Sequence, residues 1–280
     1  MAKQADDVRR DVSKSYAKAV SSPVASGCCG GGSPQKGVAA KLGGYSLEEL
    51  RVLPNEVVVN SFGCGNPVAL AGISEGDVVL DLGSGAGIDI LLASRKVGPQ
   101  GRVIGVDMTD EMIAKATENI KDSGLTNIEV RKGLIEELPV ESESVDWVIS
   151  NCVINLSPEK DKVFREIARV LRPGGRMMVS DIVAKDLPAN VREMADLYSS
   201  CISGAISEEE YLAGLREAGL VNLEIVDSLV YDAGQIEAMV ASDVEGACGC
   251  CSVSAGELRA AASSLAGKVW SIKVSARKPG

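Results

Sequence analysis

Short apolar runs alternate with amphipathic segments along the middle of this chain. An apolar run bounded by turn residues, such as residues 78–82, predicts a buried strand, and apolar residues at helical spacing, as in residues 110–123, predict a helix. The strands predicted in this way are residues 78–82, 102–106, 127–132, 145–150, 175–182, 222–227 and 268–276. The predicted helices are residues 4–20, 46–53, 67–72, 88–97, 110–123, 158–171, 188–202, 207–218 and 255–266. The alternation of strands and helices between residues 78 and 182 favours a parallel sheet with helices on both faces.

The turn after the first of these strands is rich in glycine. Residues 81–87 read Asp-Leu-Gly-Ser-Gly-Ala-Gly, which places Gly83, Gly85 and Gly87 at every second position after Asp81. Glycines let the backbone bend sharply and let a ligand lie against it, and the amides at the start of a helix favour polar or anionic groups. The spacing differs from the G-x-G-x-x-G of dinucleotide sites. Asp107 follows the second strand, at the distance expected for an acid that binds ribose hydroxyls.

Together, the first acid, the glycine spacing and the second acid resemble the S-adenosylmethionine site of class I methyltransferases. The alternative is a glycine turn needed only to reverse the chain. Ligands of open α/β sheets bind at the carboxyl ends of the strands, where several other polar residues fall. The candidate residues for binding S-adenosylmethionine are Asp81, Gly83, Gly85, Gly87, Asp107, Met108, Ile135, Glu136 and Asn151.

Composition narrows the class of protein. With 280 residues, 45% of them hydrophobic, the chain suits one domain with appendages. Its net charge of −10 and pI of about 4.8 argue against a nucleic-acid partner, because a phosphate backbone binds a basic face. No apolar run is long enough to span a bilayer, and the charged N-terminus lacks a secretory apolar segment. We therefore expect a cytoplasmic protein with neither a nucleic-acid nor a membrane partner.

The chain has eight cysteines and no histidine. The absence of histidine excludes His-ligated metals, Cys-His couples and Ser-His-Asp triads. In a reducing compartment, clustered thiols more often indicate soft-metal binding or redox chemistry than structural disulfides. The cysteines are Cys28 and Cys29 in a Gly/Ser/Pro-rich segment, Cys64 between two glycines, Cys152 after the fourth strand, Cys201, and the group Cys248, Cys250 and Cys251.

The segments around three of these cysteines resemble the arsenite S-adenosylmethionine methyltransferases. The matching stretches are Ser61-Phe-Gly-Cys-Gly-Asn-Pro67, Asp81-Leu-Gly-Ser-Gly-Ala-Gly87, Gly105-Val-Asp-Met-Thr109, Ile149-Ser-Asn-Cys-Val-Ile-Asn-Leu-Ser-Pro158 and Cys201-Ile-Ser-Gly-Ala205. The resemblance covers roughly residues 45–227. The glycine motif is common to a large superfamily, whereas the cysteine-bearing segments are far more specific.

This resemblance implies a Rossmann-like class I methyltransferase fold: a mostly parallel seven-stranded sheet closed by an antiparallel pair, with helical and cysteine-bearing appendages. We expect residues 1–44 to form an N-terminal helix and a flexible loop, residues 45–182 to bind S-adenosylmethionine, and residues 183–280 to complete the sheet around a Cys-rich insert, 228–267. The resemblance also implies that Cys64, Cys152 and Cys201 bind trivalent arsenic as substrate. Cys28 or Cys29 is then expected to take part in binding or in a redox relay.

The chemistry of arsenic supports this interpretation independently. Trivalent arsenic is thiophilic, and thiolates are the soft ligands that a protein offers. Three thiolates leave an arsenic lone pair that attacks the sulfonium methyl group, with no need for a general base. Because methylation oxidises arsenic, reduction back to the trivalent state leaves a disulfide, which a small thiol or a thioredoxin-like partner clears. The expected partners are thus arsenite, methylated arsenicals and such a reductant, and the protein is expected to be a monomer.

Other interpretations remain open at this point. Cys152 and Cys201 also suit small core positions. The group of three cysteines from 248 to 251 suits soft-metal capture, arsenic delivery or an exposed tail. At the level of function, the alternatives are a class I methyltransferase acting on a quinone or another carbon or oxygen acceptor, and a non-catalytic protein that binds soft metals.

Overall fold

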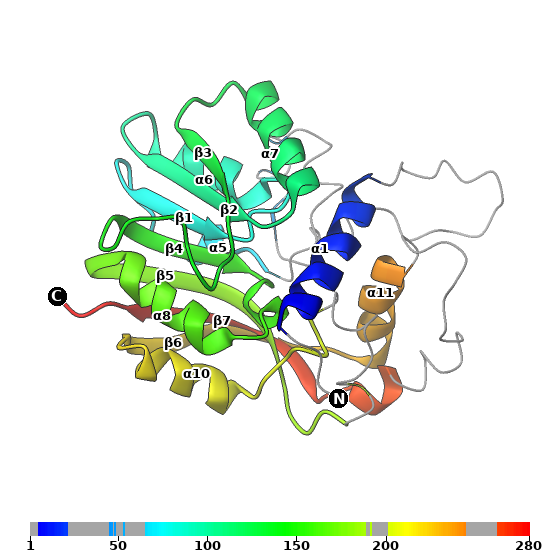
Figure 1. The fold of residues 1–280 in the computed structure, drawn as a ribbon. Coiled ribbons are helices and arrows are strands. Elements are labelled where there is room, and N and C mark those ends of the chain that lie inside the picture. The colour runs from blue at the N-terminus through cyan, green and yellow to red at the C-terminus, as the bar shows by residue number, and fades with distance from the viewer. Residues whose placement is uncertain are drawn as a thin grey trace.

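The fold is built on one seven-stranded sheet. The computed structural model describes residues 5–21, 45, 46, 48, 53, 65–188, 191, 201–244 and 262–280 (Figure 1). The strands are β1 (Val78–Leu82), β2 (Arg102–Asp107), β3 (Ile128–Lys132), β4 (Val145–Asn151), β5 (Leu171–Ala184), β6 (Val221–Val230) and β7 (Val269–Arg277), in the order β3-β2-β1-β4-β5-β7-β6. The pairs among β1 to β5 are parallel, and β7 is antiparallel to both β5 and β6. The expected class I methyltransferase sheet with its antiparallel closing pair is confirmed.

Most of the described helices lie at positions predicted from the sequence. Those described are α1 (Ala5–Ser21), α5 (Pro67–Leu70), α6 (Ile88–Val97), α7 (Asp110–Ser123), the 3₁₀-helix η1 (Ile154–Leu156), α8 (Lys160–Val170), α10 (Glu208–Glu217) and α11 (Ala233–Val244). Figure 1 shows α1 beside the sheet, on the side where α7 and α11 also lie. The arrangement of the helices around the sheet therefore agrees with the predicted α/β fold.

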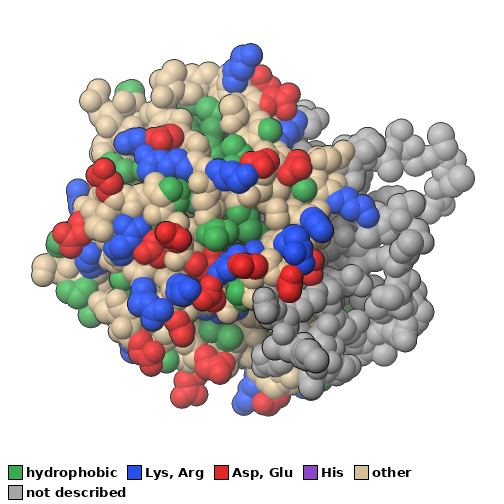
Figure 2. Space-filling model, viewed as in Figure 1, with side chains coloured by type: hydrophobic (Ala, Val, Ile, Leu, Met, Phe, Trp, Pro, Cys, Tyr) green, Lys and Arg blue, Asp and Glu red, His purple; other side chains and the backbone are tan. Residues whose placement is uncertain are grey.

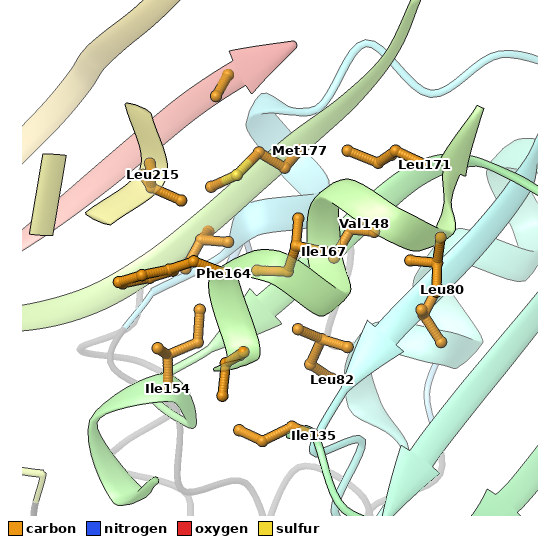
Figure 3. Packing of buried hydrophobic residues seen from close by; sticks show 14 of the residues in the cluster. Leu80, Leu82, Ile135, Val148, Ile154, Phe164, Ile167, Leu171, Met177 and Leu215 are labelled. Carbon is orange, nitrogen blue, oxygen red and sulfur yellow. The ribbon is translucent and has the colours of Figure 1, made fainter. Parts of the chain in front are cut away.

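The alternation of side chains along β1 divides the core between the two faces of the sheet. Leu80 and Leu82 pack on one face with α8 and α10, whereas Val79 packs on the other with α6. On the α8 face, Phe164 and Ile167 point toward the strands (Figure 3). A third buried cluster, which includes Val12, Cys152 and Cys201, draws on α1 and on segments that follow strands. Because this cluster contains two cysteines, it connects the core with the candidate site.

Three details differ from the sequence predictions. Strand β5 begins at Leu171 rather than at the predicted residue 175, and its register with β4 jumps from Val145↔Leu171 to Trp147↔Arg176. Residues 201–204 form a turn rather than the end of the predicted helix 188–202, of which 189, 190 and 192–200 lie outside the described residues. Helix α11 was not predicted, although Asp232 and Gln235 bond reciprocally to each other's backbone amides at its start, a capping box readable from sequence.

The described surface mixes charges of both signs. Figure 2 shows Lys and Arg side chains interspersed with Asp and Glu over the face in view. Several of them form ion pairs, such as Arg131 with Glu129 and Lys273 with Asp227. No helix in the described ranges has the length and apolar character needed to cross a membrane.

Candidate active site

One pocket at the carboxyl ends of the parallel strands collects the candidate binding residues. It encloses about 970 Å³, counting the part open to solvent. All nine residues predicted to bind S-adenosylmethionine line it, and Cys152 lines it as well. The sheet topology explains this convergence, because β1, β2, β3 and β4 are adjacent and parallel and therefore end at the same edge. The assignment of these residues to a cofactor stays a prediction.

The glycine turn forms one wall of the pocket. The amides of Gly83 and Ser84 both donate to the carbonyl oxygen of Val106, at 2.8 and 3.0 Å, which ties the turn to the end of β2. Gly83 has a φ of 65°, in the left-handed region, and a Cβ at this position would lie 2.5 Å from each methyl carbon of Val153. Glycine is therefore required here both by the backbone conformation and by the packing against Val153.

Asp107 is held rigidly at the end of β2. Its Oδ1 accepts from the amide of Thr109 at 2.8 Å, and its Oδ2 accepts from the amide of Gly85 at 3.0 Å. Burial raises the pKa of this carboxyl above its usual value, and these backbone hydrogen bonds oppose the rise. Asp107 lines the pocket in this fixed orientation, and its binding of ribose hydroxyls stays a prediction.

A buried hydrogen-bond network involves Asp89, which follows the glycine turn at the start of α6. The Tyr45 hydroxyl donates to Oδ1 of Asp89 at 2.8 Å, and Nδ2 of Asn151 donates to the Tyr45 oxygen at 2.9 Å. Asn151 also bridges to Gly65, accepting from its amide at 3.0 Å and donating to its carbonyl at 2.6 Å. This network fixes the side chain of Asn151 between β4 and the segment that begins at Gly65.

Three buried carboxyl groups, those of Asp81, Asp89 and Asp107, line the pocket. Burial raises the pKa of Asp81 well above its usual value, and the neighbouring charges of Asp89 and Asp107 raise it further. Among the described residues that line the pocket, Arg9 is the one basic side chain. The buried hydroxyl of Ser84 also has no hydrogen-bond partner within the described part of the chain. A cationic ligand that carries hydroxyl and amino groups fits this set of residues, and S-adenosylmethionine is such a ligand.

The far end of the pocket is lined by Ile135 and Glu136, which follow β3. Oε1 of Glu136 accepts from the Ser157 hydroxyl at 2.7 Å and from Nε of Arg9 at 3.1 Å. Arg9 belongs to α1, so the N-terminal helix reaches the rim of the pocket. This contact was not predicted, because the sequence indicates a helix at residues 4–20 without indicating what it contacts.

Two of the candidate cysteines converge beside the pocket. Cys152 and Cys201 are both buried, and Sγ of Cys201 donates to the carbonyl oxygen of Cys152 at 2.7 Å. Their φ angles are 59° and 63°, values that residues other than glycine adopt rarely and that concentrate at functional sites. Cys152 is disulfide-bonded in this structure, whereas Cys201 retains its thiol. Cys28, Cys29, Cys64, Cys248, Cys250 and Cys251 lie outside the described residues.

Several residues in or beside the pocket were not predicted from the sequence. Asp89 carried a signal, since it is an acid inside the otherwise apolar start of α6, Ile88-Asp89-Ile90-Leu91. Tyr45 carried none, because its partner lies 44 positions away in the sequence. Arg9, Val12 and Tyr16 line the pocket from α1, and only the tertiary structure brings them there.

Comparison of the sequence and the fold with known proteins identifies the family of this chain. A family model described as a methyltransferase domain matches residues 73–219. The arsenic(III) S-adenosylmethionine methyltransferase of Chlamydomonas reinhardtii is 32% identical, with a TM-score of 0.61, over 89% of this chain and 75% of that chain. The chain belongs to the arsenite methyltransferase family. The arsenite methyltransferase of Halobacterium salinarum is 46% identical over 200 residues, which are 71% of this chain and 50% of that protein.

A relative with a different acceptor is more distant. The ubiquinone/menaquinone biosynthesis C-methyltransferase of Serratia proteamaculans is 33% identical over 139 residues, 49% of this chain and 55% of that protein. The chain spans about half the length of the curated arsenite methyltransferases that it matches. Family membership is therefore established, and the reaction of this chain is argued below as a proposal.

Proposed function

We propose that this protein transfers a methyl group from S-adenosylmethionine to trivalent arsenic bound by Cys64, Cys152 and Cys201. The observation that carries the proposal is the contact of Cys152 with Cys201 beside the pocket: the two buried residues are 49 positions apart in sequence and are joined by a 2.7 Å hydrogen bond. Cys152 also lines the same pocket as the glycine turn. Membership of the arsenite methyltransferase family supports the choice of arsenic as acceptor.

The pocket residues have distinct tasks in this proposal. Asp107, fixed by two backbone amides, holds the ribose hydroxyls, and the positive charge of the cofactor offsets the repulsion among Asp81, Asp89 and Asp107 and so favours their ionised forms. S-adenosylmethionine supplies an electrophilic methyl group on its sulfonium. Holding donor and acceptor in register supplies the main catalytic effect, which for well-oriented reactants reaches about 7–11 kcal/mol.

The cysteines hold the acceptor. Three thiolates on trivalent arsenic leave its lone pair free to attack, so the site needs no proton acceptor. The buried position of Cys152 and Cys201, 4% and 3% exposed, excludes water from the reacting atoms. Because Cys152 is disulfide-bonded here, it must be reduced before it binds arsenic as a thiolate, which supports the requirement for a thiol reductant. Cys28 or Cys29 is proposed to serve in this exchange.

The experiment that tests the proposal compares wild-type protein with Cys201→Ser. Labelled S-adenosylmethionine, arsenite and a small thiol are incubated with each protein, and methylated arsenic is separated and counted. Cys201 does not line the cofactor pocket, and a serine hydroxyl can still donate to the Cys152 carbonyl, so the variant removes one soft ligand with little other change. We expect kcat/KM to fall by about 100-fold or more, since loss of a supporting partner alone costs 10–100-fold.

Binding of S-adenosylhomocysteine is measured on both proteins as the control for folding. Equal activity of the two proteins would keep the reaction and refute the three-thiol arrangement. A wild-type protein that binds the cofactor and yields no methylated arsenic would refute arsenic as the acceptor. A quinone or another carbon acceptor, or soft-metal binding without catalysis, would then explain the site.

A further inference from the structure

Helix α1 covers the candidate cofactor pocket as well as packing on the domain. Arg9, Val12 and Tyr16 of this helix all line the pocket. Val12 is 3% exposed and belongs to the buried cluster that contains Cys152 and Cys201. One helix face therefore lies over the methyl-donor pocket and over the two cysteines.

The side chain of Arg9 connects this helix to the rim of the pocket. Nε of Arg9 lies 3.1 Å from Oε1 of Glu136, and Nη2 of Arg9 pairs with Oε2 of Glu159. The side chains of Arg9 and Glu136 are 15% and 6% exposed, so this pair is largely shielded from water, whereas the side chain of Glu159 is 31% exposed at the outer side of the contact. A weaker hydroxyl contact of 3.4 Å between Ser13 and Thr109 also joins the helix to the rim.

We infer that α1 is a lid on the S-adenosylmethionine pocket and that Arg9 is the positioning residue that holds it closed through Glu136 and Glu159. Exchange of the cofactor requires the helix to move, because its side chains form part of the pocket wall. Closure removes water from the reacting atoms and opening releases the product, S-adenosylhomocysteine. The inference rests on the proposed cofactor and not on arsenic as the acceptor.

A lid and a simple contact residue affect binding kinetics differently. Loss of a contact to the ligand accelerates dissociation and leaves association nearly unchanged. A residue that holds a lid closed, here called the latch, acts differently. Its loss increases the fraction of protein with the lid open, so association and dissociation both accelerate while the equilibrium affinity changes less than either rate. The two rate constants measured together therefore separate the two roles.

The variant Arg9→Met tests the latch, since it keeps the apolar stem and removes the guanidinium. Arg10→Met is the matched control, because Arg10 is on the same helix, is 59% exposed and pairs with Asp7 within the helix. Tritiated S-adenosylmethionine is mixed with the arsenic-free protein, and association and displacement are followed by rapid filtration. We expect both rates to rise about 10-fold or more for Arg9→Met, as charged hydrogen bonds of this kind contribute on that scale, and to stay at the wild-type level for Arg10→Met.

A second variant changes an acidic partner of Arg9 instead of Arg9 itself. Glu159→Gln removes one partner at a position that does not line the pocket, and it should accelerate both rates without adding to the effect of Arg9→Met in the double variant. Raising the salt concentration should accelerate exchange in the wild type and not in Arg9→Met.

Rates unchanged in both Arg9→Met and Glu159→Gln, at unchanged thermal midpoints, would refute the lid and leave α1 as a packing element. Acceleration of dissociation alone would refute the latch and make Arg9 a direct contact of the ligand. Failure of the wild type to bind S-adenosylmethionine would refute the proposed cofactor itself, a result distinct from both.

Discussion

Substitution of Gly83 by alanine probes the closest packing contact of the glycine turn. The φ of 65° costs an alanine about 1–2 kcal/mol. In addition, the new Cβ would lie 2.5 Å from both Cγ atoms of Val153, a contact that must be relieved by movement. Overpacking of this kind costs about 1–3 kcal/mol. We therefore expect Gly83→Ala to lower the free energy of unfolding by about 2–5 kcal/mol.

A matched control separates the two costs. Gly124, at the end of α7, has a φ of 70°, and a Cβ at this position would meet no described atom within 4 Å, so Gly124→Ala carries the backbone cost alone. Urea unfolding under reducing conditions gives the free energy of each variant. The two variants should differ by about 1–3 kcal/mol, the overpacking cost, and Val153→Ala should recover that difference in the Gly83→Ala background. Equal destabilisation by Gly83→Ala and Gly124→Ala would refute the packing argument.

Two further predictions concern buried carboxyl groups. Burial raises the pKa of Asp181 to about 7 from 3.8, so the folded state binds this proton more tightly and stability falls as pH rises from about 4 to 7. Asp181→Asn should remove this decline and be more stable than wild type by up to about 4 kcal/mol at pH 8, with no gain at pH 4, as measured by urea unfolding at each pH. Asp89→Asn should weaken binding of cationic S-adenosylmethionine about 10-fold more than binding of S-adenosylhomocysteine, from a charge interaction of about 1–2 kcal/mol. Calorimetric titration with both ligands checks this, and the exposed Asp110→Asn should leave the ratio unchanged.

Asp81 and Asp89 differ in how far their place in the pocket can be recognised from the sequence. Asp81 is recognisable from sequence because it ends a buried strand and precedes the glycines. Asp89 becomes significant only when its hydrogen bond from Tyr45 and its effect on the pKa of Asp81 are seen together. A cationic ligand relieves the repulsion between these two carboxyl groups, so the sequence motif alone understates the preference for such a ligand.

The sequence by itself determined the sheet and the part of the pocket that lies at the ends of the parallel strands. Strands β1 and β2 and helices α6 and α7 follow from local patterns: apolar runs, helical spacing and glycine turns act over a few residues and need no distant partner. The parallel order then brings the strand ends together, so the pocket that contains Asp81 and Asp107 is predictable from these elements.

The tertiary structure alone decided which distant side chains complete that pocket. Arg9 lies 127 positions from Glu136, and Cys201 lies 49 positions from Cys152, and neither distance leaves a periodic signal in the chain. Such contacts depend on how whole elements pack, because a long-range contact is stabilised by the sum of many buried groups rather than by a local preference. The helix that covers the pocket was for this reason predictable as a helix and not as a lid.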